Sequence, residues 1–119
     1  MTEVAGLVQR LVAIPSLSGQ EHDAAEFVAH WAGEKRLDVS RRGDNVIVTV
    51  RRGRGPRVLL NSHLDTVAPV AGWQSNPHLP ELVGEKIVGL GANDAKGCVA
   101  AMLCAVAKVA EHKAVKGEV

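Results

Sequence analysis

In this 119-residue chain, residues 58–67 read Val-Leu-Leu-Asn-Ser-His-Leu-Asp-Thr-Val, a short apolar run followed by polar residues. The apolar triplet Val58-Leu59-Leu60 is typical of a fully buried strand, and polar residues follow it at once. His63 and Asp65 are two positions apart, so they face the same side of an extended chain. Because α/β proteins keep their sites where strands end, these two residues are candidates for a functional site.

Helices are expected on both sides of this stretch. Apolar residues repeat at helical spacing from Val4 to Val12, which predicts a first helix that ends before Pro15. Ser18-Gly19-Gln20-Glu21 matches a capping box, so a second helix is expected to begin there. Beyond Gly97, apolar residues at helical spacing predict a third helix of about four turns.

Strands are expected around the turn Gly53-Arg54-Gly55-Pro56. The alternating residues 45–50 predict a strand that pairs with residues 58–60, which makes 45–60 a hairpin. The other expected strands are residues 37–40, a small hairpin over residues 82–88, and residues 115–119. Residues 62–80 lack periodicity and predict a loop. This order of elements predicts an α/β fold in which helices pack on a mixed sheet.

Composition restricts the class of protein. Hydrophobic residues make up 46% and aromatic residues 3% of the chain, as in the aliphatic interior of α/β proteins. The 14 basic and 13 acidic residues nearly cancel, so no overall field attracts nucleic acid or an anionic membrane. The arginines between 41 and 57 are interpreted as a solvated turn, because no aromatic residues interleave them. No apolar run approaches the roughly 18 residues of a membrane span, and a cytoplasmic location is expected.

The chain has two cysteines, Cys98 and Cys104. On the third expected helix they would be about 9 Å apart along the axis and on different faces, so no disulfide is expected between them. They are interpreted as free thiols of a reducing compartment.

A second polar motif, residues 89–97, reads Gly-Leu-Gly-Ala-Asn-Asp-Ala-Lys-Gly. A dinucleotide-binding fingerprint needs glycine where Asp94 stands, and a phosphate-binding loop needs Gly-Lys followed by Ser or Thr, so both are excluded. Asp94 precedes a helix, where it could serve as an N-cap or as a metal ligand held by a glycine turn. Lys96 is expected to shape the turn or to pair with a carboxylate.

His63 and Asp65 likewise allow two interpretations. A neutral imidazole binds zinc well, and a neighbouring carboxylate can accept its second N–H and fix its tautomer. Alternatively, local hydrogen bonds alone satisfy His63. His78 is a weaker candidate, since it follows the loop around Trp73.

Taken together, the motifs resemble the family of acetylornithine deacetylase, succinyl-diaminopimelate desuccinylase, aminoacylase and glutamate carboxypeptidase. Three segments carry the resemblance in the family's order and spacing: Ser62 to Val67, Gly72-Trp73 followed by Asn76-Pro77, and Gly89 to Gly97. The resemblance extends from Ile14-Pro15-Ser16 onward and implies a phosphorylase/hydrolase-like zinc exopeptidase domain.

The resemblance also implies roles for three residues. His63 would ligate one zinc, Asp94 would bridge both zincs, and Asp65 would be the catalytic carboxylate that supports His63. Two zinc ions per complete active site are implied, for which cobalt can substitute. A cis peptide bond is implied after Asp94.

Other parts of the family's site are not found in residues 1–119. These are a Glu-Glu pair, a further acidic ligand, a final histidine ligand and the lid or dimerisation domain. The expected strand at 115–119 is also the point at which the sequence stops. We therefore expect residues 1–119 to be the amino-terminal part of a catalytic domain, inactive alone, with weak zinc binding or none.

The full-length protein is expected to remove an N-acyl group from an amino acid, with acetylornithine as the first choice and hence a place in arginine biosynthesis. Succinyl-diaminopimelate, acetyl-lysine and dipeptides are alternative substrates, and a homodimer without nucleic-acid or membrane partners is expected. The rival hypothesis is a non-catalytic α/β fragment, or a module that a second chain completes.

Overall fold

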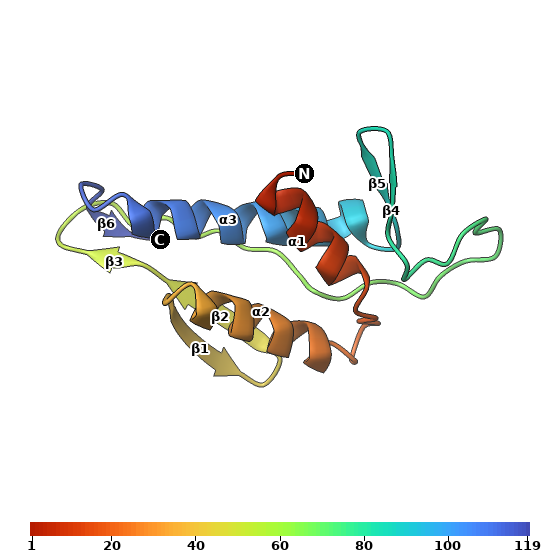
Figure 1. The fold of residues 1–119 in the computed structure, drawn as a ribbon. Helices are drawn as coiled ribbons and strands as arrows, with labels where there is room; N and C mark the ends of the chain where they lie inside the picture. Colours follow the sequence, from red (N-terminus) through yellow and green to blue (C-terminus); the bar gives the residue numbers. More distant parts are fainter.

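The chain forms three helices and three short pairs of strands, which a computed structural model describes over all residues 1–119. In chain order, the elements are α1 (Glu3–Val12), α2 (His22–Glu34), β1 (Asp38–Arg42), β2 (Asn45–Thr49), β3 (Arg51–Arg52), β4 (Glu81–Val83), β5 (Lys86–Val88), the turn η1 (Ala92–Lys96), α3 (Gly97–Glu111) and β6 (Gly117–Glu118). α1 lies against α3, while α2 covers the hairpin of β1 and β2 (Figure 1). A long irregular segment connects β3 to β4.

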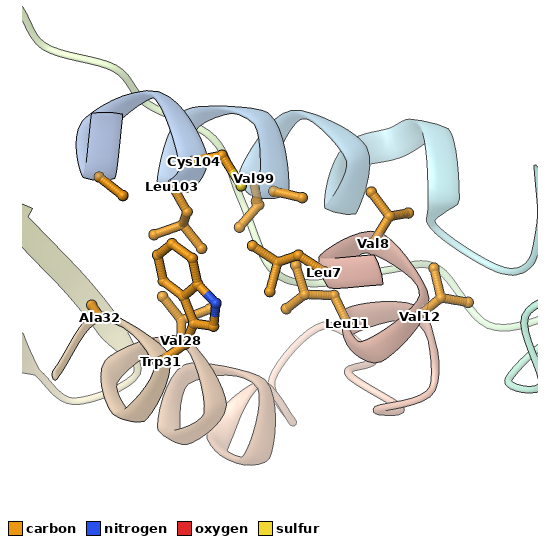
Figure 2. Packing of buried hydrophobic residues seen from close by; sticks show 12 residues of the cluster. Leu7, Val8, Leu11, Val12, Val28, Trp31, Ala32, Val99, Leu103 and Cys104 are labelled. Atoms are coloured by element: carbon orange, nitrogen blue, oxygen red, sulfur yellow. The ribbon is translucent and has the colours of Figure 1, made fainter. Parts of the chain in front are cut away.

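The core lies between the helices, because each presents an apolar stripe. Figure 2 shows Trp31 of α2 pointing toward Leu103 of α3, with Leu7 and Leu11 of α1 beside them. Leu11 is fully buried, and Trp31 is only 4% exposed. The predicted first and third helices are confirmed, the third over fifteen residues.

The start of α2 differs from the prediction. The helix begins at His22, with Glu21 before it and no side-chain cap. Glu21 instead accepts a hydrogen bond from the backbone N–H of Gly19, and the Ser18 hydroxyl donates to Asp65. The capping box was therefore wrong, because a long-range partner takes the hydroxyl that a cap would use.

The first hairpin also lies elsewhere than predicted. β1 pairs antiparallel with β2, from Asp38 opposite Thr49 to Arg42 opposite Asn45. The connecting turn is Gly43-Asp44, and Gly43 has the positive φ of 61° that such two-residue turns require. The hairpin therefore spans 38–49, and the predicted hairpin over 45–60 is wrong.

Residues 58–60 do not form the predicted buried strand. Val58, Leu59 and Leu60 are 52%, 89% and 40% exposed. The backbone N–H of Val58 donates to the carbonyl of Glu118, but no strand pairs with the rest of the segment. The prediction is therefore wrong, and the segment instead lines a cavity of about 660 Å³ together with Val28 and Met102.

The α/β class is confirmed, although the strands form three separate antiparallel pairs instead of one mixed sheet. β4 pairs with β5, as predicted for residues 82–88, and this hairpin projects at one end of the molecule (Figure 1), with Ile87 of β5 packed against the core. β6 pairs with β3, so the predicted strand at 115–119 is confirmed over Gly117–Glu118. Residues 62–80 form the predicted loop, with one parallel bridge from Thr66 to Leu17.

Arginines near β3 have structural contacts that the prediction of a solvated turn missed. The guanidinium of Arg52 donates to the carbonyls of Ala110 at 3.0 Å and His112 at 2.8 Å, at the end of α3. Arg51 and Arg57 both contact the carboxylate of Glu118. These arginines therefore connect the β3–β6 pair and the end of α3.

Two further findings concern the surface and the thiols. None of the helices has both the length and the apolar character that crossing a membrane requires. Cys98 is exposed and Cys104 is buried, and both thiols are free, as predicted.

Candidate metal centre

Three segments far apart in the sequence meet at the candidate site. They are residues 16–18 after α1, residues 63–66, and η1 before α3. The first two run side by side: Thr66 donates its N–H to the carbonyl of Ser16, and Ser18 donates its N–H to the carbonyl of Thr66. The fully buried Ser16 adds a 2.7 Å hydrogen bond from its hydroxyl to the carbonyl of Leu64. Backbone pairing therefore fixes the loop that carries His63 and Asp65.

His63 and Asp94 converge, as the sequence predicted. The Nε2 atom of His63 lies 2.9 Å from Oδ1 of Asp94, although 31 positions separate the two residues in sequence. The side chains are 50% and 83% exposed, so both can reach a ligand from solvent. Histidine nitrogens and carboxylate oxygens are among the ligands that bind zinc in proteins.

Asp65 lies on the opposite side of the His63 ring. Nδ1 of His63 is 3.1 Å from Oδ1 of Asp65 and 3.1 Å from the backbone carbonyl of Asp65. Both oxygens can only accept, so Nδ1 carries the hydrogen. This arrangement points Nε2 toward Asp94 and matches the way carboxylates orient metal-binding imidazoles.

The electrostatics of the site follow from these contacts. Burial lowers the pKa of His63, but hydrogen bonds to the Asp65 carbonyl and to Asp94 outweigh it, so the pKa is raised overall. The Ser18 hydroxyl, followed by the neighbouring His63, lowers the pKa of Asp65. A negative Asp65 is thereby kept beside the imidazole.

Asp94 is not the N-cap of α3, which was one of the two interpretations of the sequence. Lys96 occupies the position before the helix, and no side chain caps it. Asp94 instead lies within η1, where its backbone (φ −121°, ψ 95°) is not helical. The peptide bond between Asp94 and Ala95 is cis, as the family resemblance implied.

Lys96 is the last residue of η1, two positions after Asp94, and only 1% of its surface is exposed. Its ammonium donates to the carbonyls of Leu11 at 2.9 Å and Ile14 at 2.6 Å, at the end of α1. Burial lowers the pKa of Lys96 to about 8. The expected pairing with a carboxylate is wrong, since the partners are carbonyls, which a cation at a helix C-terminus satisfies well.

The residues present fit part of a metal site. His63 and Asp94 supply one nitrogen and one carboxylate, whereas stable zinc sites use three or four protein ligands. No group of three or more His, Cys, Asp or Glu side chains is placed to hold a metal ion. His78 belongs to no such group, and its Nδ1 is buried without a partner. The pair therefore supplies fewer ligands than a stable zinc site uses.

Sequence reasoning did not find Ser18 as part of the site. Its hydroxyl donates to Oδ2 of Asp65 at 2.5 Å, across 47 positions of sequence. The only local signal was the Ser-x-x-Glu spacing, which equally indicates a helix cap.

Comparison with known proteins shows the family of this α/β chain, in which His63 and Asp94 lie in contact. The sequence model of Peptidase family M20/M25/M40 matches residues 59–119. The chain belongs to this family, which confirms the resemblance drawn from its motifs.

Individual proteins with similar sequences agree with this family assignment. The chain is 32% identical over 120 residues to a succinyl-diaminopimelate desuccinylase of Rhizorhabdus wittichii, covering 94% of this chain and 32% of the relative. It is 36% identical over 110 residues to the enzyme of that name in Sphingopyxis alaskensis, covering 85% and 29%. An N-acetyl-L-citrulline deacetylase of Xanthomonas campestris is 33% identical over 70 residues, covering 59% and 19%. The chain spans about a third of the length of the first relatives it matches.

Proposed function

We propose that residues 1–119 are part of the catalytic domain of a two-zinc amidohydrolase that removes an N-acyl group from an amino acid. Family membership and the 2.9 Å approach of His63 to Asp94 support this proposal. The remaining ligands would come from polypeptide outside these residues. The complete protein is proposed to be a cytoplasmic homodimer.

His63 and Asp94 would hold the metal ions in this scheme. When bound, two zinc ions supply Lewis-acid chemistry, polarising an amide carbonyl and lowering the pKa of a bound water. His63 would be the nitrogen ligand and Asp94 the carboxylate ligand that these residues contribute. Asp65 would keep Nδ1 of His63 protonated, because its carboxylate accepts from that nitrogen.

The substrate class is an N-acyl amino acid, and two members have separate support. The motifs in this sequence are most like those of acetylornithine deacetylases, which suggests N-acetylornithine. The names of several relatives suggest N-succinyl-diaminopimelate instead. Both are linear amides next to a carbon that carries a carboxylate, so the same chemistry serves either.

A chimaera tests the function. Residues 1–119 would replace the matching segment of the Rhizorhabdus wittichii relative, and release of acetate or succinate would be measured with added zinc. We expect turnover that falls at least about 100-fold in His63→Ala and Asp94→Ala, because each removes a metal ligand. His22→Ala is the matched control, since His22 is exposed and contacts only Asp44.

Two outcomes would contradict the proposal. The first is a folded chimaera that binds two zinc ions and hydrolyses neither substrate. The second is full activity in His63→Ala.

Residues 1–119 alone should give no turnover with zinc, because no general base of the family is present, and general acid–base catalysis is typically worth about 10²–10⁴-fold. Turnover by the isolated chain would show that the site is complete without further polypeptide.

A further inference from the structure

An apolar groove lies between β2 and the extended segment of residues 58–61. The cavity of about 660 Å³ that forms it is lined by residues of both segments and by Val28 of α2 and Val99, Met102 and Val106 of α3. Leu60, on one side of the groove, is still 40% exposed. Because water gains little from such surfaces, the groove favours an apolar occupant.

Both sides of the groove carry backbone groups without partners. Residues 45–49 form backbone hydrogen bonds only with β1, and residues 59–63 form none with any backbone group. In an antiparallel pair, alternate residues direct their N–H and carbonyl groups to opposite edges of a strand. The groups of Val46 and Val48 therefore point away from β1. Two free strand edges thus border the groove, and free edges bind further strands.

β6 already lies between these two edges at one end of the groove. Val119 exchanges two backbone hydrogen bonds with Val50, both of 2.9 Å, on the side of β2. On the other side, Glu118 donates its N–H to the carbonyl of Pro56 and accepts from the N–H of Val58, also at 2.9 Å. β6 is therefore antiparallel to β3 and forms a parallel bridge to Arg57.

The direction and the face of such a strand follow from this pairing. Beyond Val119, which itself lines the cavity, an extended chain in the same register would next pass Thr49 and Val48. Residues opposite each other in a sheet share a face, so Val119 shares the face of Val50, and hence that of Val48 and Val46, which pack against the core. Every second residue after Val119 would therefore face the core.

We propose that the groove binds one further β-strand, which continues β6 past Val119 and has an apolar residue at every second position. The strand would pair antiparallel with β2 and parallel with residues 58–61, and it would join both into one mixed sheet. A directly connected strand is favoured over a separate peptide, because binding is then intramolecular. Such polypeptide exists in the Rhizorhabdus wittichii relative, of which the match covers only 32%.

The test adds six residues after Val119 in two chains of the same composition. The tail Lys-Val-Lys-Val-Lys-Val places valines on the core face, and the tail Val-Lys-Val-Lys-Val-Lys places lysines there. We expect the first tail alone to slow hydrogen exchange at the amides of Val46, Val48 and Leu60, which are the donors that the new strand would use. In urea unfolding, it should also raise the folding equilibrium constant at least about tenfold over the unextended chain, roughly the effect of burying one valine.

Three results would overturn the proposal. Equal protection by both tails would mean that the groove does not select the alternation, and no protection by either would mean that it binds no strand. Protection of Val48 in the unextended chain, together with a dimer in sedimentation, would assign the groove to a second copy. The amide of Val50, which is already paired, reports in each chain whether the fold is kept. Neither zinc nor substrate is needed, so the result is independent of the proposed hydrolysis.

Discussion

Gly91 packs so closely against Thr66 that a Cβ added at Gly91 would lie 2.5 Å from Cγ2 of Thr66. Thr66 follows Asp65 in the loop of His63 and is 6% exposed. Gly91 directly precedes η1, which carries Asp94. The loop that carries His63 and the turn that carries Asp94 therefore pack together at this contact. A side chain larger than that of glycine would not fit at position 91.

Gly91→Ala is expected to destabilise the fold and to separate His63 from Asp94. Gly91 has a φ of 75°, and a left-handed conformation costs an alanine about 1–2 kcal/mol. Overpacking against Thr66 adds about 1–3 kcal/mol. Denaturant unfolding should therefore show a loss of about 2–5 kcal/mol in the free energy of unfolding.

Gly84→Ala separates the two causes. Gly84 also has a positive φ, 61°, but a Cβ there would meet nothing within 4 Å. Only the conformational cost of about 1–2 kcal/mol is expected. Equal losses in the two variants would mean that the contact with Thr66 relaxes freely.

Lys96→Ala is expected to lower the free energy of unfolding by about 2–4 kcal/mol, as for other large-to-small changes in a core. The substitution leaves a cavity and removes the donor to the carbonyls of Leu11 and Ile14. Lys108→Ala is the control, because the Lys108 side chain is 66% exposed and contacts only Glu111, and it should change the value by less than about 0.5 kcal/mol. A similar, small change in both variants would contradict a structural role for Lys96.

Local patterns predicted the helices and the approach of His63 to Asp94. The stripes of α1 and α3 repeat every three to four residues, and that period alone specifies which face is buried. Their positions after an apolar segment and before a helix made His63 and Asp94 candidates, and the family resemblance then implied their roles. Positions of this kind can be predicted from residues that are neighbours in the sequence.

Long-range donors could not be predicted in the same way. Ser18 reaches Asp65 across 47 positions, Lys96 reaches Leu11 across 85, and Arg52 reaches His112 across 60. Each looks locally like something else: a helix cap, a turn residue and a solvated charge. The apolar residues 58–60 were misread for a related reason, since a strand requires pairing partners that its own sequence does not specify.

Arg52→Ala is expected to destabilise the end of α3. The guanidinium donates to the carbonyls of Ala110 and His112, and more distantly to those of Val109 and Val115. Removing a charged donor from several carbonyls should cost about 1–3 kcal/mol in the free energy of unfolding. Arg54→Ala, at an exposed position with no polar contact, should stay within about 0.5 kcal/mol. Hydrogen exchange should also be faster in the last turn of α3 in Arg52→Ala only, and unchanged exchange there would refute the capping role.

Zinc binding by residues 1–119 is expected to be weak, since two protein ligands fall short of the three or four of stable sites. Calorimetry with zinc chloride should show a low affinity that His63→Ala and Asp94→Ala each abolish. His112→Ala should leave it unchanged, because His112 is an exposed residue at the end of α3. Tight one-to-one binding would mean that a further ligand is present, and His78→Ala would then be the first variant to measure.

Glu118 should make the stability of the β3–β6 pair depend on pH. Arg51 contacts both carboxylate oxygens of Glu118, at 3.0 and 3.2 Å, and its hydrogen bonds lower the pKa of Glu118 from the ordinary value of 4.5. The unfolded chain then binds the proton more readily than the folded chain as pH falls, so the contribution of Glu118 is fully present above pH 4.5 and is lost below it.

Thermal unfolding followed by circular dichroism should give a lower Tm for Glu118→Gln than for the wild type at pH 6, and the difference should shrink toward pH 3. Glu81→Gln, at an exposed glutamate of β4 without an ion pair, should show no such convergence. A Tm difference between Glu118→Gln and the wild type that is the same at both pH values would show that the charge of Glu118 does not stabilise the fold.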